Sequence, residues 1–172
     1  MARAIIGGGC FWCVEGAYKD MRGVESALPG YAGGHDPNPT YNSVCAGITG
    51  HAEVAEVIYD PSIISYETIL EVFFTVHDPT QLNRQGNDVG TQYRSSIFYV
   101  DENQKLIAEN VLEDFKQYFD EEIVTEITEL TNYHEAEKYH HNYFQLNSGN
   151  GYCQMIVAPK LSKIRQKMAH LY

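Results

Sequence analysis

The chain has 172 residues, enough for one domain or two very small ones, and 44% of them are hydrophobic, as in ordinary globular proteins. This composition excludes disordered and fibrous classes. Twelve basic residues against 23 acidic ones give a net charge of −11, so phosphate backbones repel the chain and we expect no nucleic-acid partner.

The N-terminal part of the chain predicts a strand, a helix and a long loop. A short apolar run over residues 4–6 stops at three glycines, residues 7–9. Apolar residues then recur at helical spacing and predict a helix from Cys10 to Met21. Residues 29–51 are rich in Gly, Pro, Asn and Thr and predict a long ordered loop, of the kind that usually carries function.

A strand and a helix are predicted next. The residues from Ala52 to Tyr59 alternate between two faces as in a strand, which predicts a strand with Glu53 on the same face as Ala55. Apolar residues at helical spacing then predict a helix from Tyr66 to His77, with Ser65 as its N-cap.

The rest of the chain continues the alternation of strands and helices after a second polar loop at residues 78–94. The predicted elements are a strand (Ile97 to Val100), a helix (Asp101, as cap, to about Phe119), a strand (Val124 to Leu130), a short helix (134–146) and a basic amphipathic helix (Ala158 to Tyr172). This order predicts one α+β domain over residues 1–172, built as a two-layer sandwich of helices on a mixed sheet.

Cys10 is the first candidate for chemistry, because it follows the three glycines and opens a predicted helix. Unpaired N–H groups and the dipole at a helix start favour a thiolate, so we expect the pKa of this thiol to fall from ~8.5 towards ~7. The alternative is a buried cysteine that acts as a small hydrophobe.

Cys13 completes a C-x-x-C pattern with Cys10, which is typical of thioredoxin-like oxidoreductases. The signal is weak because two large aromatic residues, Phe11 and Trp12, separate the two cysteines. These rings either belong to the ordinary core or form the wall of an apolar pocket beside the nucleophile.

Glu53 is the second candidate. If its strand face is buried, the loss of water raises the pKa of the carboxyl group and makes it a general acid near neutral pH. An exposed strand glutamate is the alternative.

No metal site or cofactor is predicted. His134-Glu135 begins a pattern like that of zinc proteases, but Lys138 stands where the second histidine is needed. The four cysteines, at positions 10, 13, 45 and 153, form no second C-x-x-C, and the glycines match no nucleotide-binding motif. No apolar run reaches the ~18 residues of a membrane span, and the N-terminus is too short for a signal peptide, so we expect a cytoplasmic protein without a membrane partner.

Cys153 follows a segment rich in Asn and Gly, residues 147–152, which we expect to be mobile. A thiol on such a segment can reach a sulfenic acid formed elsewhere and condense with it to a disulfide. The alternative is an incidental loop cysteine.

A series of motifs resembles the A-type peptide methionine sulfoxide reductases and covers nearly the whole chain in the expected order. The signature G-C-F-W-x-x-E is matched by residues 9–15. The further matches are Gly30-Tyr31-Ala32-Gly33-Gly34, Pro37-Asn38-Pro39-Thr40-Tyr41, Val44-Cys45, Thr49-Gly50-His51-Ala52-Glu53, Tyr59-Asp60-Pro61, His77-Asp78-Pro79-Thr80, the run from Gln85 to Ser95, and Gly151-Tyr152-Cys153.

The resemblance implies a fold related to the ferredoxin-like plait and the reduction of the S-epimer of methionine sulfoxide, free or in proteins. It implies that Cys10 attacks the sulfoxide sulfur and that Glu53 protonates the sulfoxide oxygen. Tyr41 and Tyr93 are then the hydrogen-bond donors to that oxygen, and Asp88 belongs to the same polar network.

The resemblance also implies that Phe11 and Trp12 hold the substrate methyl group. After methionine leaves, Cys10 is a sulfenic acid, which a resolving cysteine converts to a disulfide that thioredoxin reduces. We expect Cys153 to be that resolving cysteine, because no cysteine follows it. Cys13, where some members of the family have glycine, is the alternative resolver.

Two other functions compete with the reductase. One is a thioredoxin-like thiol oxidoreductase that uses Cys10 and Cys13. The other is a noncatalytic module that binds methionine-like side chains through Phe11 and Trp12. In each case we expect a monomer.

Overall fold

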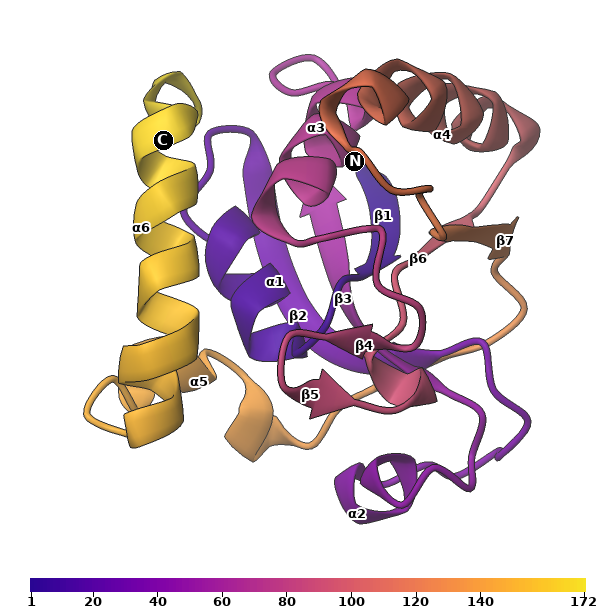
Figure 1. Ribbon diagram of the computed structural model, residues 1–172, viewed down its shortest axis with the longest axis vertical. Helices are drawn as coiled ribbons and strands as arrows, with labels where there is room; N and C mark the ends of the chain where they lie inside the picture. Colours follow the sequence, from indigo (N-terminus) through magenta and orange to yellow (C-terminus); the bar gives the residue numbers. More distant parts are fainter.

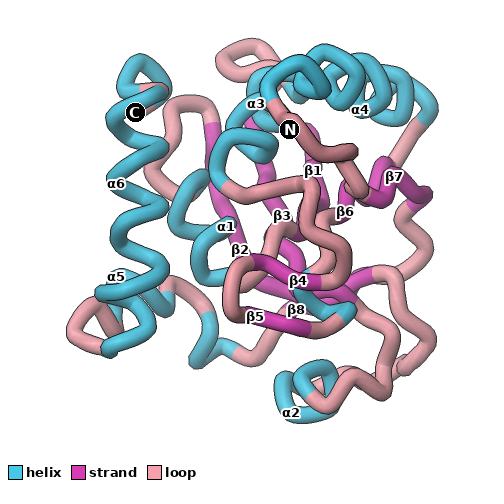
Figure 2. The backbone as a smooth tube through the Cα atoms, in the orientation of Figure 1, coloured by secondary structure: helices cyan, strands magenta, loops and turns pink.

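The computed structural model describes all residues from Met1 to Tyr172 and has an α+β fold, with helices packed on a six-stranded mixed sheet (Figures 1 and 2). The strands lie in the order β7 (Glu126–Glu129), β6 (Ser96–Tyr99), β1 (Ala2–Gly7), β3 (Ala52–Tyr59), β2 (Val24–Ala32) and β8 (Tyr133–Glu135). All neighbouring pairs are antiparallel except β6 with β7.

Six α-helices accompany the sheet: α1 (Phe11–Tyr18), α2 (Tyr41–Cys45), α3 (Tyr66–Val76), α4 (Glu102–Phe115), α5 (Tyr143–Leu146) and α6 (Ala158–Lys167). Two-residue strands β4 (Arg84–Gln85) and β5 (Asp88–Val89) pair with each other, and a five-residue π-helix (Cys153–Val157) leads into α6. None of the helices combines the length and the apolar character that crossing a lipid bilayer requires.

The main core lies between one face of the sheet and the helices α1, α3, α4 and α6. Alternation in β3 sends Ala55, Val57 and Tyr59 into this core, while Val54 joins a smaller apolar cluster on the opposite face. Glu53 has the parity of Ala55, so the strand directs its carboxyl group towards the helix layer.

The predicted strand β3 and helix α3 are confirmed, almost residue for residue. The Ser65 hydroxyl caps α3 by accepting the Thr68 N–H at 3.1 Å. Asp101 caps α4 in the same way, with the Gln104 N–H donating to its carboxylate at 2.8 Å. The basic amphipathic tail is also confirmed as α6, although its last residues turn into a short 3-10 helix at Ala169–Leu171.

Two predicted segments were wrong. The expected loop at residues 29–51 begins with the end of β2, because pairing with β3 along the strand overrides the turn signals of Pro29 and Gly30. The ring of Tyr133 packs directly on Gly30, and a side chain there would clash with it, because an added Cβ would lie 2.4 Å from Tyr133 Cε2. The expected helix at residues 134–146 instead contains β8, which pairs with β2, a 3-10 turn and the one-turn helix α5.

The central strand β1 delivers the chain directly to the site. It ends at Gly7, and Gly9 adopts a φ of +91°, a backbone conformation that favours glycine. Gly8 packs on His77 and Gly9 on Gln85, where added Cβ atoms would lie 2.9 and 2.8 Å from those side chains. The glycines therefore let the chain turn sharply and begin α1 immediately after Cys10.

Candidate functional site

Cys10 and Glu53 meet where the start of α1 faces β3. Cys10 is the N-cap residue of α1 and 7% exposed, and Glu53 is 1% exposed. The backbone N–H of Phe11 donates to Glu53 Oε1 at 3.3 Å, which ties the carboxyl group to the start of the helix. The other oxygen, Glu53 Oε2, is buried and has no hydrogen-bond partner. Buried polar atoms without a hydrogen-bond partner are uncommon, and a catalytic role is one of the reasons they occur.

The environment of Glu53 keeps its proton near neutral pH. Burial raises the pKa of this carboxyl group to about 8, the N–H of Phe11 opposes the shift, and the charge of Asp88 adds to it. The carboxyl group of Glu53 therefore carries its proton at neutral pH, and the buried strand face is the condition that the sequence argument required.

The expected lowering of the Cys10 pKa was wrong. Burial raises the pKa of this thiol well above its usual value, and the negative charge of Glu53 adds to the rise. The backbone N–H at the helix start and the hydroxyl of Tyr152 lower it, but by less. The loss of solvent thus outweighs the effect of the helix start, and at neutral pH Cys10 is a thiol near a carboxylic acid.

Two predicted oxygen donors, Tyr41 and Tyr93, lie half-buried near Glu53, at the start of α2 and the end of a 3-10 turn. Burial raises the pKa of each phenol, and the charge of Glu53 is the next cause in both cases. Both phenols are therefore hydrogen-bond donors at physiological pH. Glu137 accepts the backbone N–H of Tyr41 at 3.0 Å and fixes the start of α2. The exposed Cys45, at the end of α2, lies beside both phenols.

Asp88 joins the site through a residue that sequence reasoning missed. The hydroxyl of Tyr152 donates to Asp88 Oδ2 at 2.5 Å and also lies beside the Cys10 thiol. The motif Gly151-Tyr152-Cys153 contains this residue, but a role was predicted only for its cysteine.

Aromatic rings, among them Phe11 and Trp12, pack together at the start of α1 beside Cys10. Trp12 stacks on Tyr143 with centroids 3.8 Å apart and planes 6° apart. Its indole N–H donates to His140 Nδ1 at 3.2 Å, and the ring of His140 also lies 5.1 Å from that of Phe11. Trp12 is thereby held at a fixed angle. No sequence pattern indicated this packing role of His140.

The remaining two cysteines lie behind Cys10. Cys13, one turn along α1, is 2% exposed, and burial raises the pKa of its thiol to about 11. Cys153 is fully buried at the start of the π-helix, so the expectation of a thiol on a mobile loop was wrong. The charge of Cys13 acts on Cys10, and that of Cys153 acts on Cys13, which places Cys13 within electrostatic range of both.

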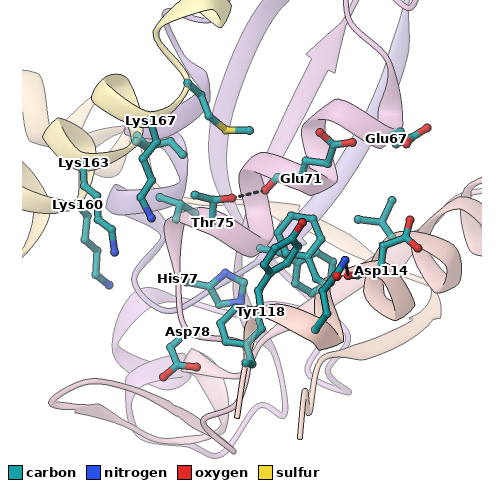
Figure 3. Close-up of a pocket in the computed structure, with 18 of the residues that line it drawn as sticks. Glu67, Glu71, Thr75, His77, Asp78, Asp114, Tyr118, Lys160, Lys163 and Lys167 are labelled. Atoms are coloured by element: carbon teal, nitrogen blue, oxygen red, sulfur yellow. Dashed lines mark hydrogen bonds between the residues drawn. The ribbon is translucent and has the colours of Figure 1, made fainter. Parts of the chain in front are cut away.

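A separate groove lies outside this site. It has a volume of 1110 Å³ between α3, the end of α4 and α6, and neither Cys10 nor Glu53 lines it (Figure 3). His, Cys, Asp and Glu side chains nowhere gather in threes around a possible metal position.

Comparisons with known proteins agree on one family. A family model described as peptide methionine sulfoxide reductase matches residues 2–171. The peptide methionine sulfoxide reductase MsrA of Chromobacterium violaceum is 53% identical, with 99% of this chain and 98% of that protein aligned. The MsrA of Natronomonas pharaonis is also 53% identical, with 98% of this chain and 96% of that protein aligned.

Solved structures give the same picture. Reduced Mxr1 from Saccharomyces cerevisiae superposes with a TM-score of 0.84 at 32% identity, covering 88% of each chain. Methionine sulfoxide reductase A of Corynebacterium diphtheriae gives 0.78 at 37% identity, covering 85% of this chain and 74% of the other. Mxr1 in complex with Trx2 has the same fold, with a TM-score of 0.60 at 24% identity and coverages of 83% and 84%.

Proposed function

The chain belongs to the peptide methionine sulfoxide reductase family, and from that premise we propose how its own residues carry out the reaction. The protein is an enzyme that reduces methionine S-sulfoxide to methionine. One observation carries the assignment of roles: the carboxyl group of Glu53, which holds a proton at neutral pH and has an unpartnered Oε2, lies close enough to the Cys10 thiol for its charge to act on it.

In the reduction step, Glu53 gives its proton to the sulfoxide oxygen while Cys10 Sγ attacks the sulfoxide sulfur. The phenols of Tyr41 and Tyr93 donate hydrogen bonds to the same oxygen, where negative charge develops in the transition state. The thiol proton of Cys10 passes through Glu53 to the same oxygen, the S–O bond breaks, and the oxygen leaves as water while Cys10 Sγ stays bonded to the substrate sulfur. This water then attacks Cys10 Sγ and returns one proton to Glu53, and the sulfur–sulfur bond breaks with its electron pair going to methionine. The products are methionine and a sulfenic acid on Cys10, so the oxygen and both electrons are accounted for.

The apolar side of the site selects the epimer. Phe11 and Trp12 face the substrate methyl group, while the donors Glu53, Tyr41 and Tyr93 lie on the oxygen side. The R-epimer exchanges these groups, which sets its oxygen against aromatic rings and leaves buried donors unpaired. Tyr152 and Asp88 close the polar side of the same pocket through their 2.5 Å hydrogen bond.

An assay with both sulfoxide epimers and dithiothreitol tests the function. We expect methionine to form from the S-epimer and at least about a hundredfold more slowly from the R-epimer, because unpaired buried donors cost about 1–3 kcal/mol each. Chromatography of the free amino acid measures both rates. Consumption of neither epimer contradicts the function, and preference for R contradicts the geometry proposed for the pocket.

The second step resolves the sulfenic acid. We propose that the Cys153 thiol attacks the Cys10 sulfur and releases water, which leaves a disulfide that thioredoxin reduces. Cys153 begins a π-helix, a rare conformation that is common at functional sites, and the change needed to bring it to Cys10 starts there. The alternative resolver is Cys13, which lies closer to Cys10 in the chain and within electrostatic range of both thiols.

Variants of the two cysteines separate these alternatives. Cys153→Ser is expected to release one methionine per enzyme at the normal rate and then to stop when thioredoxin is the only reductant, because the sulfenic acid finds no partner. Rapid quenching followed by steady-state assays measures both phases. Cys13→Ser serves as the matched control. Persistence of turnover in Cys153→Ser together with its loss in Cys13→Ser assigns the resolving role to Cys13.

We also propose the fold type, the number of domains, the oligomeric state and the cellular compartment of the protein. The unit β1-α1-β2-β3-α3-β6, with strand order β6-β1-β3-β2, supports a ferredoxin-like plait, and a continuous core supports one domain over residues 1–172. We propose that the enzyme is a monomer. Four free cysteines fit the reducing cytoplasm, where thioredoxin is the expected partner.

A further inference from the structure

Helix α6 concentrates positive charge in an acidic protein. Of the 12 Lys and Arg residues in the chain, four lie within its ten residues, Lys160, Lys163, Arg165 and Lys167, and it contains no acidic residue. Arg165 pairs with Asp20 at 3.0 Å, on the side of the helix away from the groove. The other three cations take part in no ion pair. We call these three residues the lysine row.

The lysine row forms one wall of the 1110 Å³ groove described above (Figure 3). Three of the four acidic lining residues, Glu67, Glu71 and Asp114, form the opposite wall, and the fourth, Asp78, lies next to His77 at one end of the groove. No ion pair crosses between the walls. The acids repel one another, since the charges of Glu67 and Asp114 add to the burial that raises the pKa of Glu71. The floor between the walls is apolar and includes Phe74, Phe115 and Ile164. The groove thus has apolar residues between a positively charged wall and a negatively charged wall.

The groove lies next to the proposed disulfide. The π-helix that begins at Cys153 continues into α6, and a rise of about 1.5 Å per residue places Lys160 roughly 10 Å and Lys167 roughly 20 Å along the helix from Cys153. A standard protein interface buries about 800 Å² on each partner, which corresponds to a patch on the order of 30 Å across. A protein that reaches Cys153 therefore covers Lys160 in the same footprint, and it covers the rest of the lysine row when its contact extends along α6. Lys160 is close enough to Cys13 to oppose the rise of its pKa.

We propose that the lysine row and its groove are the docking surface for the dithiol protein that reduces the enzyme, and that this partner presents an acidic edge to α6. The proposal rests on the proposed disulfide cycle. Without such a surface, an enzyme of charge −11 repels an acidic reductant, so the row supplies the local attraction that steers the encounter. The acidic wall repels the acidic edge of a partner that binds the other way round, so it favours one orientation of the partner in the groove.

The chemistry at this surface is a disulfide exchange. A thiolate of the partner attacks one sulfur of the enzyme disulfide and forms a mixed disulfide, with the other enzyme sulfur leaving as a thiolate that takes up a proton. The second thiol of the partner then attacks the mixed bond and releases the reduced enzyme. Two electrons and two protons pass from the dithiol to the enzyme, and the partner leaves as a disulfide.

Charge reversal on the row tests the proposal, with a purified acidic thioredoxin as the probe. Lys163→Glu is expected to raise the KM for thioredoxin about three- to fivefold at low salt, and Lys163→Glu with Lys167→Glu about tenfold or more. The differences should disappear at about 0.5 M salt, where exposed charges are screened. Turnover with dithiothreitol should not change, because both lysines are exposed and lie outside the catalytic pocket. Lys105→Glu on α4 is the matched control, since it changes the net charge equally.

Three results distinguish this inference from the function on which it rests. An equal KM for thioredoxin in Lys163→Glu and Lys105→Glu overturns the docking surface while the enzyme remains active with dithiothreitol. A raised KM for an oxidised peptide with an unchanged KM for thioredoxin also overturns it and assigns the groove to the substrate. Failure of the unmodified enzyme to form methionine with dithiothreitol contradicts the proposed function instead.

Discussion

Replacing Cys10 with serine is expected to lower the rate of methionine formation by on the order of a thousandfold or more, the scale seen when an enzyme loses its nucleophile. A serine oxygen is a weaker nucleophile than sulfur, and it has no oxidation state that can accept the sulfoxide oxygen as a sulfenic acid does. The measurement is a single turnover with methionine S-sulfoxide and excess enzyme, which removes the effect of the later steps.

Cys45→Ser is the matched control for this variant. Cys45 is exposed at the end of α2, and a serine there keeps a hydrogen-bonding group beside the phenols of Tyr41 and Tyr93. We expect it to retain most of the activity. A Cys10→Ser enzyme that still forms methionine at a comparable rate has another nucleophile, which contradicts the assigned role of Cys10.

Glu53→Gln is expected to slow the reduction step by about 10²–10⁴-fold, the usual contribution of a general acid, with little change in substrate affinity. The glutamine amide still accepts the N–H of Phe11, but it cannot transfer a proton. The pH profile gives a second readout. The pKa of Glu53 is raised to about 8, so the proton-donating form is present below pH 8 and is lost as the pH rises through that value.

The rate of the unmodified enzyme should therefore fall above pH 8, and this alkaline limb should be absent in Glu53→Gln. Glu56→Gln is a suitable control on the same strand, because Glu56 points away from the site and pairs with Arg3 at 2.6 Å. Stopped-flow or quenched-flow kinetics across pH 6–10 would show the difference. A single-turnover rate that is unchanged in Glu53→Gln removes this residue as the acid.

Periodicity and capping residues predicted those elements whose local sequence preference matches the structure that tertiary packing imposes on them. Strand β3 and helix α3 have clean periodicity and, in α3, a serine cap, so their bounds were predictable. Strand β2 was hidden because Pro29 and Gly30 carry turn signals, and only pairing with a distant strand makes them extended. The same holds for β8, which exists because the edge of β2 is available to it.

The site was predictable in its chemistry and less so in its electrostatics. The positions of Cys10 and Glu53, one at a helix start and one on a buried strand face, followed from spacing. The pKa of Cys10 did not, because it depends on the depth of burial and on Glu53 itself, neither of which a sequence displays. Tyr152 entered the site from a segment that is distant in the chain, so nothing near Cys10 indicated it.

The central position of β1 has a consequence for the newborn polypeptide. This strand is made first, yet its neighbours β3 and β6 begin at residues 52 and 96. Its hydrogen bonds with β3 wait until about a third of the chain has been made, and those with β6 wait until more than half has been made. Contacts this distant in sequence form slowly. During synthesis the thiols of Cys10 and Cys13 are therefore open to oxidants that the finished fold excludes. The repair enzyme is itself most vulnerable to oxidative damage before its sheet closes.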